Sequence, residues 1–278
     1  MNIPKRITTR ERVWELDAMR GLLILCVLVI HLYYTVDAFC VNGYYNIDSY
    51  AYVNTTDPLH FWFDWGSDGK IYRAFLTPEF VSAWTHWGVI AFFAISGICC
   101  LFSRDNLHRG LIMLAAAFVF SGFTKLLAIW TQNPGQFIRF GVLHCYAYCH
   151  ILYYFLFENR RSSTLLAAAA GVLLLGYYLR FHPIYLNTPL LYPFGIYESG
   201  APSRDYWPIF PMLGWLLIGV VWGRHFYPER KTMFPDTPMK KWTRPLQYLG
   251  RHSGKIYLAH IFVYTAVFCG IGWAFGLL

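Results

Sequence analysis

Charged residues are scarce in this sequence: only 14% are Asp, Glu, Lys or Arg, whereas 56% are hydrophobic. A soluble globular domain carries about a quarter charged residues, and disordered chains and coiled coils are also rich in polar residues. The shortage of charge therefore excludes these classes and indicates a membrane protein. Because a spanning helix takes roughly 20 apolar residues, a chain of 278 residues has room for about seven helices with their loops.

Several chemical motifs are also missing. The sequence has no Walker-type Gly-rich Lys motif, no His-Glu-x-x-His, and no cysteine pair at metal spacing with nearby histidines outside the apolar runs. The run Cys145–His150 resembles a ligand cluster, but its members point around a helix rather than to one side. We therefore expect no metal. Six of the seven cysteines lie in apolar runs, so we also expect no disulfide.

The apolar residues gather in segments that are long enough to span a bilayer. This pattern predicts an all-α, polytopic membrane helix bundle of about seven helices, forming one domain over residues 1–278. The predicted spans are Leu16–Phe39, Trp84–Phe102, Gly110–Trp130, Ile138–Phe157, Thr164–Phe181, Trp207–Trp222 and Gly254–Phe275.

The basic residues favour one orientation of this bundle. If the loops are assigned alternately with the N-terminus in the cytoplasm, 17 Lys and Arg lie on the cytoplasmic side and 6 on the other side. The positive-inside rule then predicts that the N-terminus is inside and the C-terminus outside. This topology accounts for the net charge of +8 without nucleic acid as a partner.

Two long outer loops follow from this topology, over residues about 40–83 and 182–205. The first combines five carboxylates with many aromatic residues, which suits a folded cap or an amphipathic segment at the interface. The second is rich in Pro, Gly and Tyr. Such aromatic residues form either an interfacial belt, the commoner case, or a carbohydrate-binding surface.

Ionisable residues inside predicted spans are functional candidates because they are costly in lipid. Arg20 and His31 in the first span are eleven positions apart, which is three helical turns plus about 20°, and roughly 16 Å. They therefore share one helix face, with Arg20 at the cytoplasmic mouth and His31 near the midplane. The face can bind an anionic donor and deliver it to a base. Alternatively, Arg20 is an ordinary anchor and His31 an interhelical hydrogen-bonding residue.

Further candidates lie in later spans. His144 is two turns below the outer surface of the fourth span, and Asp205 opens the sixth, where a carboxylate either caps a helix or orients a histidine. Arg251 lies at the start of the last helix, where backbone amides favour a phosphate. The pair Ser96-Gly97 permits close helix contact and is interpreted as packing.

Taken together, the motifs resemble the heparan-alpha-glucosaminide N-acetyltransferase catalytic-domain family and its bacterial relatives. The spacing from Arg20 to His31 is also similar to the signature of the wider acyltransferase 3 superfamily. The segments that carry the resemblance are Glu15–Gly21 with His31, Phe93–Gly97, Arg109–Leu111, Phe140–His144, Asp205–Gly214 with Gly219 and Arg224, and Leu249–Ser253 with Tyr257 and His260.

This resemblance implies a membrane-embedded acyltransferase that moves an acetyl or other acyl group from cytoplasmic acetyl-CoA to a sugar hydroxyl or amine on the outer side. Its partners would be acetyl-CoA, a glycan acceptor and the lipid bilayer, and it would lie in the bacterial cytoplasmic membrane. The resemblance does not decide whether the protein forms a homo-oligomer. His31, Asp205 and His144 are the predicted catalytic residues. The predicted donor-binding residues are Arg20, Arg109, Arg251, His252 and Ser253.

One alternative function stays open from the sequence. A transporter or flippase for a sugar or a lipid-linked precursor would line its conduction path with the same polar residues. No internal repeat of the kind that many transporters carry is visible. The two functions differ in acetyl-CoA affinity, which only the acyltransferase requires.

Overall fold

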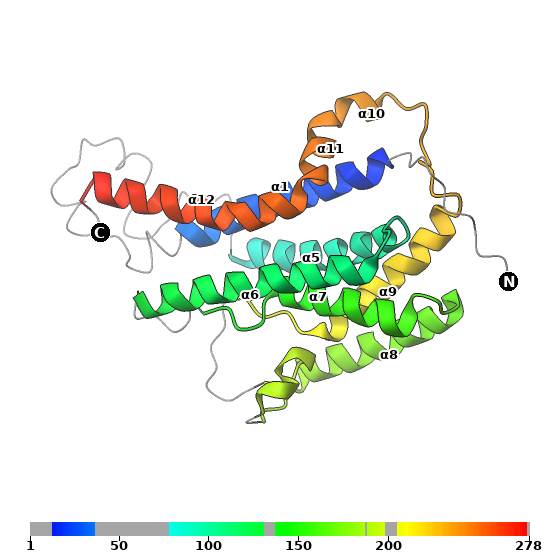
Figure 1. The fold of residues 1–278 in the computed structure, drawn as a ribbon, viewed down its shortest axis with the longest axis horizontal. Helices are drawn as coiled ribbons and strands as arrows, with labels where there is room; N and C mark the ends of the chain where they lie inside the picture. The colour runs from blue at the N-terminus through cyan, green and yellow to red at the C-terminus, as the bar shows by residue number, and fades with distance from the viewer. Residues whose placement is uncertain (1–12, 37–77, 131–136, 187, 198–204, 277–278) are drawn as a thin grey trace. The chain divides into compact units, whose positions relative to one another are not determined.

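The computed structural model describes residues 13–36, 78–130, 137–186, 188–197 and 205–276. Most of these residues are helical (Figure 1). The helices are α1 (Trp14–Val36), α5 (Pro78–Cys100), α6 (Asn106–Trp130), α7 (Val142–Leu152) continuing as the π-helix η3 (Tyr153–Phe157), α8 (Ser162–Phe181), the 3-10 helix η4 (Pro189–Phe194), α9 (Ile209–Phe226), α10 (Met239–Trp242), α11 (Arg244–Arg251) and α12 (Ser253–Ala274).

The all-helical prediction is confirmed for the described residues, where the β structure consists of one isolated bridge between Tyr185 and Tyr197. Each of the seven predicted apolar segments forms a helix over most of its length. Two apolar stretches, Trp84–Cys100 within α5 and Val142–Phe157 formed by α7 and η3, are shorter than a typical span. Five are long and apolar enough to cross a membrane: Trp14–Tyr33, Asn106–Trp130, Ser162–Phe181, Ile209–Phe226 and Ser253–Ala274.

Two outer loops were predicted as well. Most of the first, the cap over residues 40–83, lies outside the described residues. In the second, over residues 182–205, the chain forms η4, and the Tyr206 hydroxyl just beyond the loop donates to the carbonyl of Tyr192 at 2.6 Å. The rings of Tyr185 and Tyr197, and those of Tyr192 and Tyr206, are in contact, so aromatic residues of this loop pack on one another.

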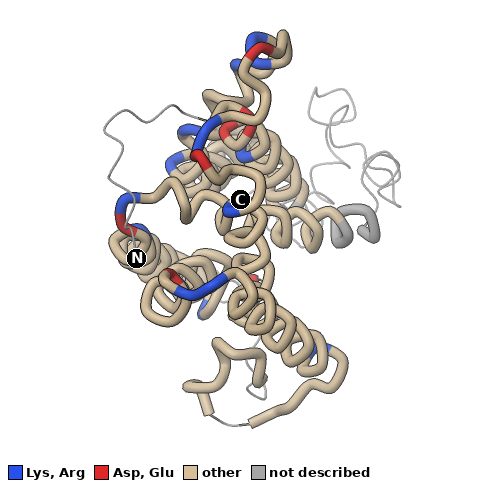
Figure 2. The backbone as a smooth tube through the Cα atoms, turned by 90° about the vertical axis from the view of Figure 1, so that its right-hand side faces the viewer, with Lys and Arg blue, Asp and Glu red and all other residues tan. Residues whose placement is uncertain are grey.

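Charged residues are concentrated near helix ends and in connections, and long stretches of the helices carry none (Figure 2). In α8 the basic residue is Arg180, in the last turn, and in α12 it is Lys255, in the first turn. This distribution is the one that a lipid-exposed helix requires, because charge is costly in hydrocarbon.

The chain divides into two compact units. The first contains Met1–Trp14 and Ile90–Thr237. Within it, α8 packs on α9, α6 packs on α7, and α7 also contacts α9. Helix α9 is the most buried of the spans, and small residues let its neighbours approach closely: a Cβ at Gly219 would collide with the carbonyl oxygen of Ala94 in α5.

The second unit contains Glu15–Val89 and Pro238–Leu278. Here α1 lies beside α12, and both helices run in the same direction (Figure 1). One face of α1 is exposed and apolar, with residues at the three- and four-residue spacing of a helix stripe. These residues are Met19, Leu22, Leu25, Val29 and Leu32. The opposite face of α1 is therefore the one that packs on the rest of its unit.

Candidate active site

A close crossing of α1 and α11 begins the site. A Cβ at Gly21 would collide with the carbonyl oxygen of Leu246, and a Cβ at Gly250 with the carbonyl oxygen of Asp17. Both positions therefore need glycine, because the two backbones are in contact there. The crossing places the segment Asp17–Gly21 of α1 against the end of α11, so the segments that carry two predicted donor-binding residues, Arg20 and Arg251, are in contact.

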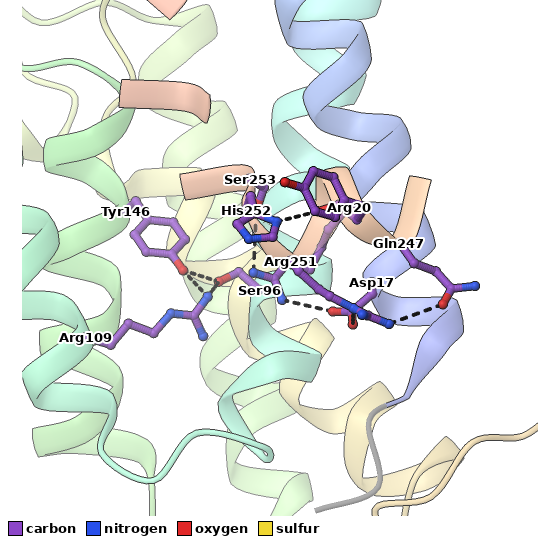
Figure 3. A network of polar contacts seen from close by, with 10 residues as sticks. Asp17, Arg20, Ser96, Arg109, Tyr146, Gln247, Arg251, His252 and Ser253 are labelled. Carbon is purple, nitrogen blue, oxygen red and sulfur yellow. Dashed lines mark hydrogen bonds and ion pairs between the residues drawn. The ribbon is translucent and has the colours of Figure 1, made fainter. Parts of the chain in front are cut away.

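Two guanidinium groups share one carboxylate at this crossing (Figure 3). The Asp17 carboxylate lies 3.7 Å from Nη1 of Arg20 and accepts a hydrogen bond from Nε of Arg251 at 3.3 Å. Asp17 is nearly buried, whereas the side chains of Arg20 and Arg251 are 31% and 41% exposed. One negative charge cannot neutralise two positive ones, so the cluster retains positive charge that faces solvent and favours an anion.

The start of α12 contributes to the same cluster. Ser253 is its first residue, and the buried Ser253 hydroxyl accepts a hydrogen bond from Arg20 at 3.5 Å. The first backbone N–H groups of a helix have no partner within the helix, and they add to the local positive potential. The neighbouring His252 places Nδ1 2.9 Å from the carbonyl of Tyr248, on the preceding turn (Figure 3).

Further along the same two helices, His31 meets His260. Nδ1 of His31 lies 2.6 Å from Nε2 of His260, and the ring centroids are 4.7 Å apart. The other ring nitrogen of His260, Nδ1, lies 2.5 Å from the carbonyl oxygen of Tyr257. His260 is 4% exposed, whereas His31 is only half-buried. The pair thus has one buried and one accessible member.

The prediction that Arg20 and His31 share one helix face is confirmed, because both side chains contact α12. Tyr264, one turn after His260 in α12, donates from its hydroxyl to the carbonyl of Leu28 at 3.1 Å. Polar contacts therefore join α1 and α12 at two levels, the guanidinium cluster near the start of both helices and the histidine pair further along. We call the residues of these two levels the α1–α12 polar face.

A second polar cluster lies in the first unit, around the hydroxyl of Ser96 (Figure 3). Ser96 Oγ lies 2.9 Å from Nε2 of His150 and 3.0 Å from the Tyr146 hydroxyl. Arg109 donates to Ser96 Oγ at 3.3 Å and also to the Tyr146 hydroxyl. Nδ1 of His150 lies 3.6 Å from Sγ of Cys100. Apart from Arg109, which is half-buried, these side chains are buried.

This Ser96 cluster differs from the sequence-based interpretation. The pair Ser96-Gly97 was expected to serve packing, and Gly97 does so, since a Cβ there would collide with the carbonyl oxygen of Leu216. Ser96 itself joins α5 to α6 and α7 through hydrogen bonds, which the interpretation missed. Of the run Cys145–His150, Tyr146 and His150 enter this cluster. Within the described residues, no group of three or more His, Cys, Asp or Glu is arranged to bind a metal.

His144 and Asp205 both bind the start of α7. Oδ2 of Asp205 accepts the backbone N–H of Val142 at 3.0 Å, and Nδ1 of His144 accepts that of Gly141 at 3.4 Å. Nε2 of His144 lies 3.4 Å from Oγ of Ser121. Asp205 thus binds the N-terminus of α7 rather than that of α9, the helix it precedes. Burial raises the pKa of Asp205 to about 6.

The structure therefore brings together three of the predicted donor-binding residues, Arg20, Arg251 and Ser253, with His252 next to them in the chain. Arg109 has its contacts in the first unit instead. Sequence reasoning missed the partnership of His260 with His31. The only signal was that His260 lies seven positions after Ser253, and hence on the same face of the last helix.

Comparison with known proteins identifies the family. The family model described as heparan-alpha-glucosaminide N-acetyltransferase, catalytic, matches residues 58–262, well over half of the chain. The matched range includes Ser96, Arg109, Arg251 and His260, and it begins after α1, so Arg20 and His31 precede it. No curated protein and no solved structure matches the chain. The family match shows that the chain belongs to the heparan-alpha-glucosaminide N-acetyltransferase catalytic family.

Proposed function

We propose that the protein transfers an acetyl or related acyl group from acetyl-CoA on the cytoplasmic side of a bacterial inner membrane to a sugar hydroxyl or amine on the outer side. The observation that carries the proposal is the α1–α12 polar face. It contains a positively charged cluster near the start of α1 and a histidine pair further along the apolar helices. Membership of an acetyltransferase family supports the same chemistry.

The proposed topology has seven spans, with the N-terminus inside and the whole chain acting as one domain. Arg20 contacts Ser253 near the start of both α1 and α12, and His31 contacts His260 further along both. The two helices are therefore parallel. If each crosses the membrane once, parallel first and last spans require an odd number of spans in total, which supports seven over six or eight.

The phosphates of acetyl-CoA are proposed to bind Arg20, Arg251 and the start of α12. Asp17 orients both guanidinium groups and neutralises only one of the two positive charges. The distance from Arg20 to His31 along α1 is roughly 16 Å, which suits the extended pantetheine arm of the donor. A donor held in this way presents its thioester to the histidine pair.

His31 is proposed as the general base. Its ring is half-buried, so it is accessible to a substrate, and a neutral imidazole can take a proton from a hydroxyl or an amine. Arg109 stays a predicted donor-binding residue, and its hydrogen-bond partners are the neutral hydroxyls of Ser96 and Tyr146. His144 and Asp205 stay predicted catalytic residues, although both already bind the start of α7.

Donor binding gives the first test. Acetyl-CoA is expected to raise the melting temperature of the purified protein in detergent, because a ligand that binds only the folded state stabilises it. The variant Arg20→Ala should lose most of this stabilisation. Arg104→Ala is the matched control, since Arg104 is an exposed arginine outside the cluster. His31→Ala should keep the stabilisation and lose acetyl transfer.

The same assay separates the transferase from the transporter. A transporter or flippase would move its substrate without chemical change and would not be stabilised by acetyl-CoA. Absence of stabilisation at millimolar acetyl-CoA, together with flux of an unmodified sugar in proteoliposomes, would contradict the proposed function.

A further inference from the structure

The tautomer of His260 is fixed by its contact with the backbone. Nδ1 of His260 lies 2.5 Å from the carbonyl oxygen of Tyr257. A carbonyl oxygen only accepts hydrogen bonds, so the proton of this bond must lie on Nδ1. In a neutral imidazole the second nitrogen is then an acceptor, and Nε2 of His260 carries the lone pair.

The tautomer of His31 follows from that of His260. Nδ1 of His31 lies 2.6 Å from Nε2 of His260, a distance at which one proton lies between the two nitrogens. Because Nε2 of His260 accepts, His31 must donate from Nδ1. The alternative, with an additional proton on the pair, would create a cation among apolar helices, where charge is costly. The lone pair of His31 therefore lies on Nε2.

Within the described part of the chain, the rings in contact with the pair are those of Tyr257 and Tyr264. The Tyr257 ring is in an edge-to-face arrangement with both imidazoles, with centroid distances of 6.1 Å to His31 and 5.3 Å to His260. Tyr264 faces His260 at 5.7 Å, and its hydroxyl donates to the carbonyl of Leu28. Among the described residues, no protein group forms a hydrogen bond with Nε2 of His31. The acceptor nitrogen of the pair is thus left for a substrate.

We propose that His260 is a positioning residue for His31 in the transfer reaction: it accepts the proton on His31 Nδ1 and thereby keeps the lone pair on His31 Nε2. This inference rests on the proposed function and makes it more specific. Nε2 of His31 is the atom that acts as base, and His260 is the residue that keeps His31 in the reactive tautomer.

The reaction balances with this pair alone. Nε2 of His31 takes the proton from the sugar hydroxyl or amine, whose oxygen or nitrogen forms a bond with the acyl carbon as the carbon–sulfur bond breaks. The proton then passes from His31 to the departing CoA thiolate. While His31 carries the positive charge, its Nδ1–H bond to His260 stabilises the imidazolium. No net proton is gained or lost.

The tautomer can be measured without any activity. Nitrogen-15 NMR of the full-length protein, labelled at histidine and reconstituted in lipid, distinguishes protonated from unprotonated ring nitrogens. Comparison with His31→Ala assigns the His31 signals. We expect an unprotonated Nε2 and a protonated Nδ1 for His31. A protonated Nε2 would overturn the proposal, whatever substrate the enzyme uses.

Two substitutions at position 260 supply the kinetic test. His260→Gln keeps a hydrogen-bond acceptor on a side chain of similar reach, whereas His260→Leu removes it. We expect His260→Leu to lower kcat about 10²-fold or more, with an unchanged KM for acetyl-CoA, because a base in the wrong tautomer is inactive. His260→Gln should recover most of the rate. His182→Leu, at the exposed end of α8, is the control for loss of a histidine.

The possible outcomes are distinct. A His260→Leu enzyme with the rate of the unaltered protein, or a His260→Gln enzyme as slow as His260→Leu, would overturn the positioning role. If the unaltered protein transfers no acetyl group to any amine or hydroxyl acceptor, the proposed function fails. In that case the nitrogen-15 spectrum still decides whether His260 sets the tautomer of His31.

Discussion

The α1–α12 polar face and the Ser96 cluster both contain a histidine and an arginine on apolar helices. The two regions differ in how many hydrogen-bond partners these side chains have. In the Ser96 cluster, both ring nitrogens of His150 have partners, Ser96 and Cys100, and His150 is completely buried. On the polar face, His31 is half-buried, and within the part of the chain that the structure describes one of its two ring nitrogens has a hydrogen-bond partner. A buried network in which every polar group has a hydrogen-bond partner holds helices together. An accessible network with a polar group that has no protein partner is available to a ligand.

The arginines differ in the same way. Arg109 is bound by two hydroxyls and lies over the ring of Tyr146, 5.4 Å from its centroid. Arg20 and Arg251 share the carboxylate of Asp17. A shared carboxylate orients both groups and still leaves positive charge for a ligand. The comparison therefore predicts that substitutions in the α1–α12 polar face mainly change catalysis, and that substitutions in the Ser96 cluster mainly change stability.

The largest effect is expected at the accessible histidine. His31→Ala should lower acetyl transfer by about 10²- to 10⁴-fold, the usual contribution of a general base. Its loss of stability should not exceed the about 1–3 kcal/mol of one unsatisfied buried polar group, because the variant leaves Nε2 of His260 without its partner. Steady-state kinetics and thermal unfolding of the same preparation measure both. A His31→Ala protein that unfolds early but turns over normally would reverse the comparison.

The next largest effect is expected at the crossing that builds the polar face. Gly21→Ala places a Cβ against the carbonyl oxygen of Leu246, so the backbones of α1 and α11 must separate. Overpacking of this kind costs about 1–3 kcal/mol, and the shift should also weaken acetyl-CoA binding. Gly122→Ala in α6 is the matched control, because a Cβ there meets open space. If the two substitutions change the melting temperature and the affinity for acetyl-CoA equally, the α1–α11 crossing contributes to neither.

A similar loss of stability, without loss of chemistry, is expected in the Ser96 cluster. His150→Ala leaves the hydroxyl of Ser96 and the thiol of Cys100 without their partner. An unsatisfied buried polar group costs about 1–3 kcal/mol. The melting temperature should therefore fall while kcat per folded molecule is kept. His108→Ala, at an exposed position of α6, should change neither quantity. A large loss of kcat in His150→Ala would give this cluster a chemical role.

The smallest effect is expected at Asp205. Its pKa lies near 6 in the folded protein and near 3.8 as a free side chain, so the folded state binds the additional proton between these pH values. Stability linked to this group is therefore present at pH 4 and is lost as the pH rises through 6. Asp205→Asn cannot ionise, so its melting temperature relative to the unaltered protein should rise by a few degrees from pH 4 to 7. A melting-temperature difference between the two proteins that stays the same from pH 4 to 7 would contradict the raised pKa of Asp205.

The sequence predicted the parts of the molecule that depend on local patterns. Apolar runs located the helices, and helix periodicity placed Arg20 and His31 on one face, since both are properties of a single segment. The pairing of His31 with His260 joins residues from opposite ends of the chain, which no local pattern encodes. For the same reason, Asp205 was predicted at the start of the helix that follows it, and its actual partner is α7.

The central claim is that acetyl transfer depends on the accessible nitrogen of His31. The most direct measurement is product formation in proteoliposomes that contain the purified protein, with radiolabelled acetyl-CoA as the donor and an amino sugar as the acceptor. The account predicts labelled N-acetyl sugar with the unaltered protein and none above background with His31→Ala, although this variant still binds acetyl-CoA. Equal product from the two proteins would contradict the account.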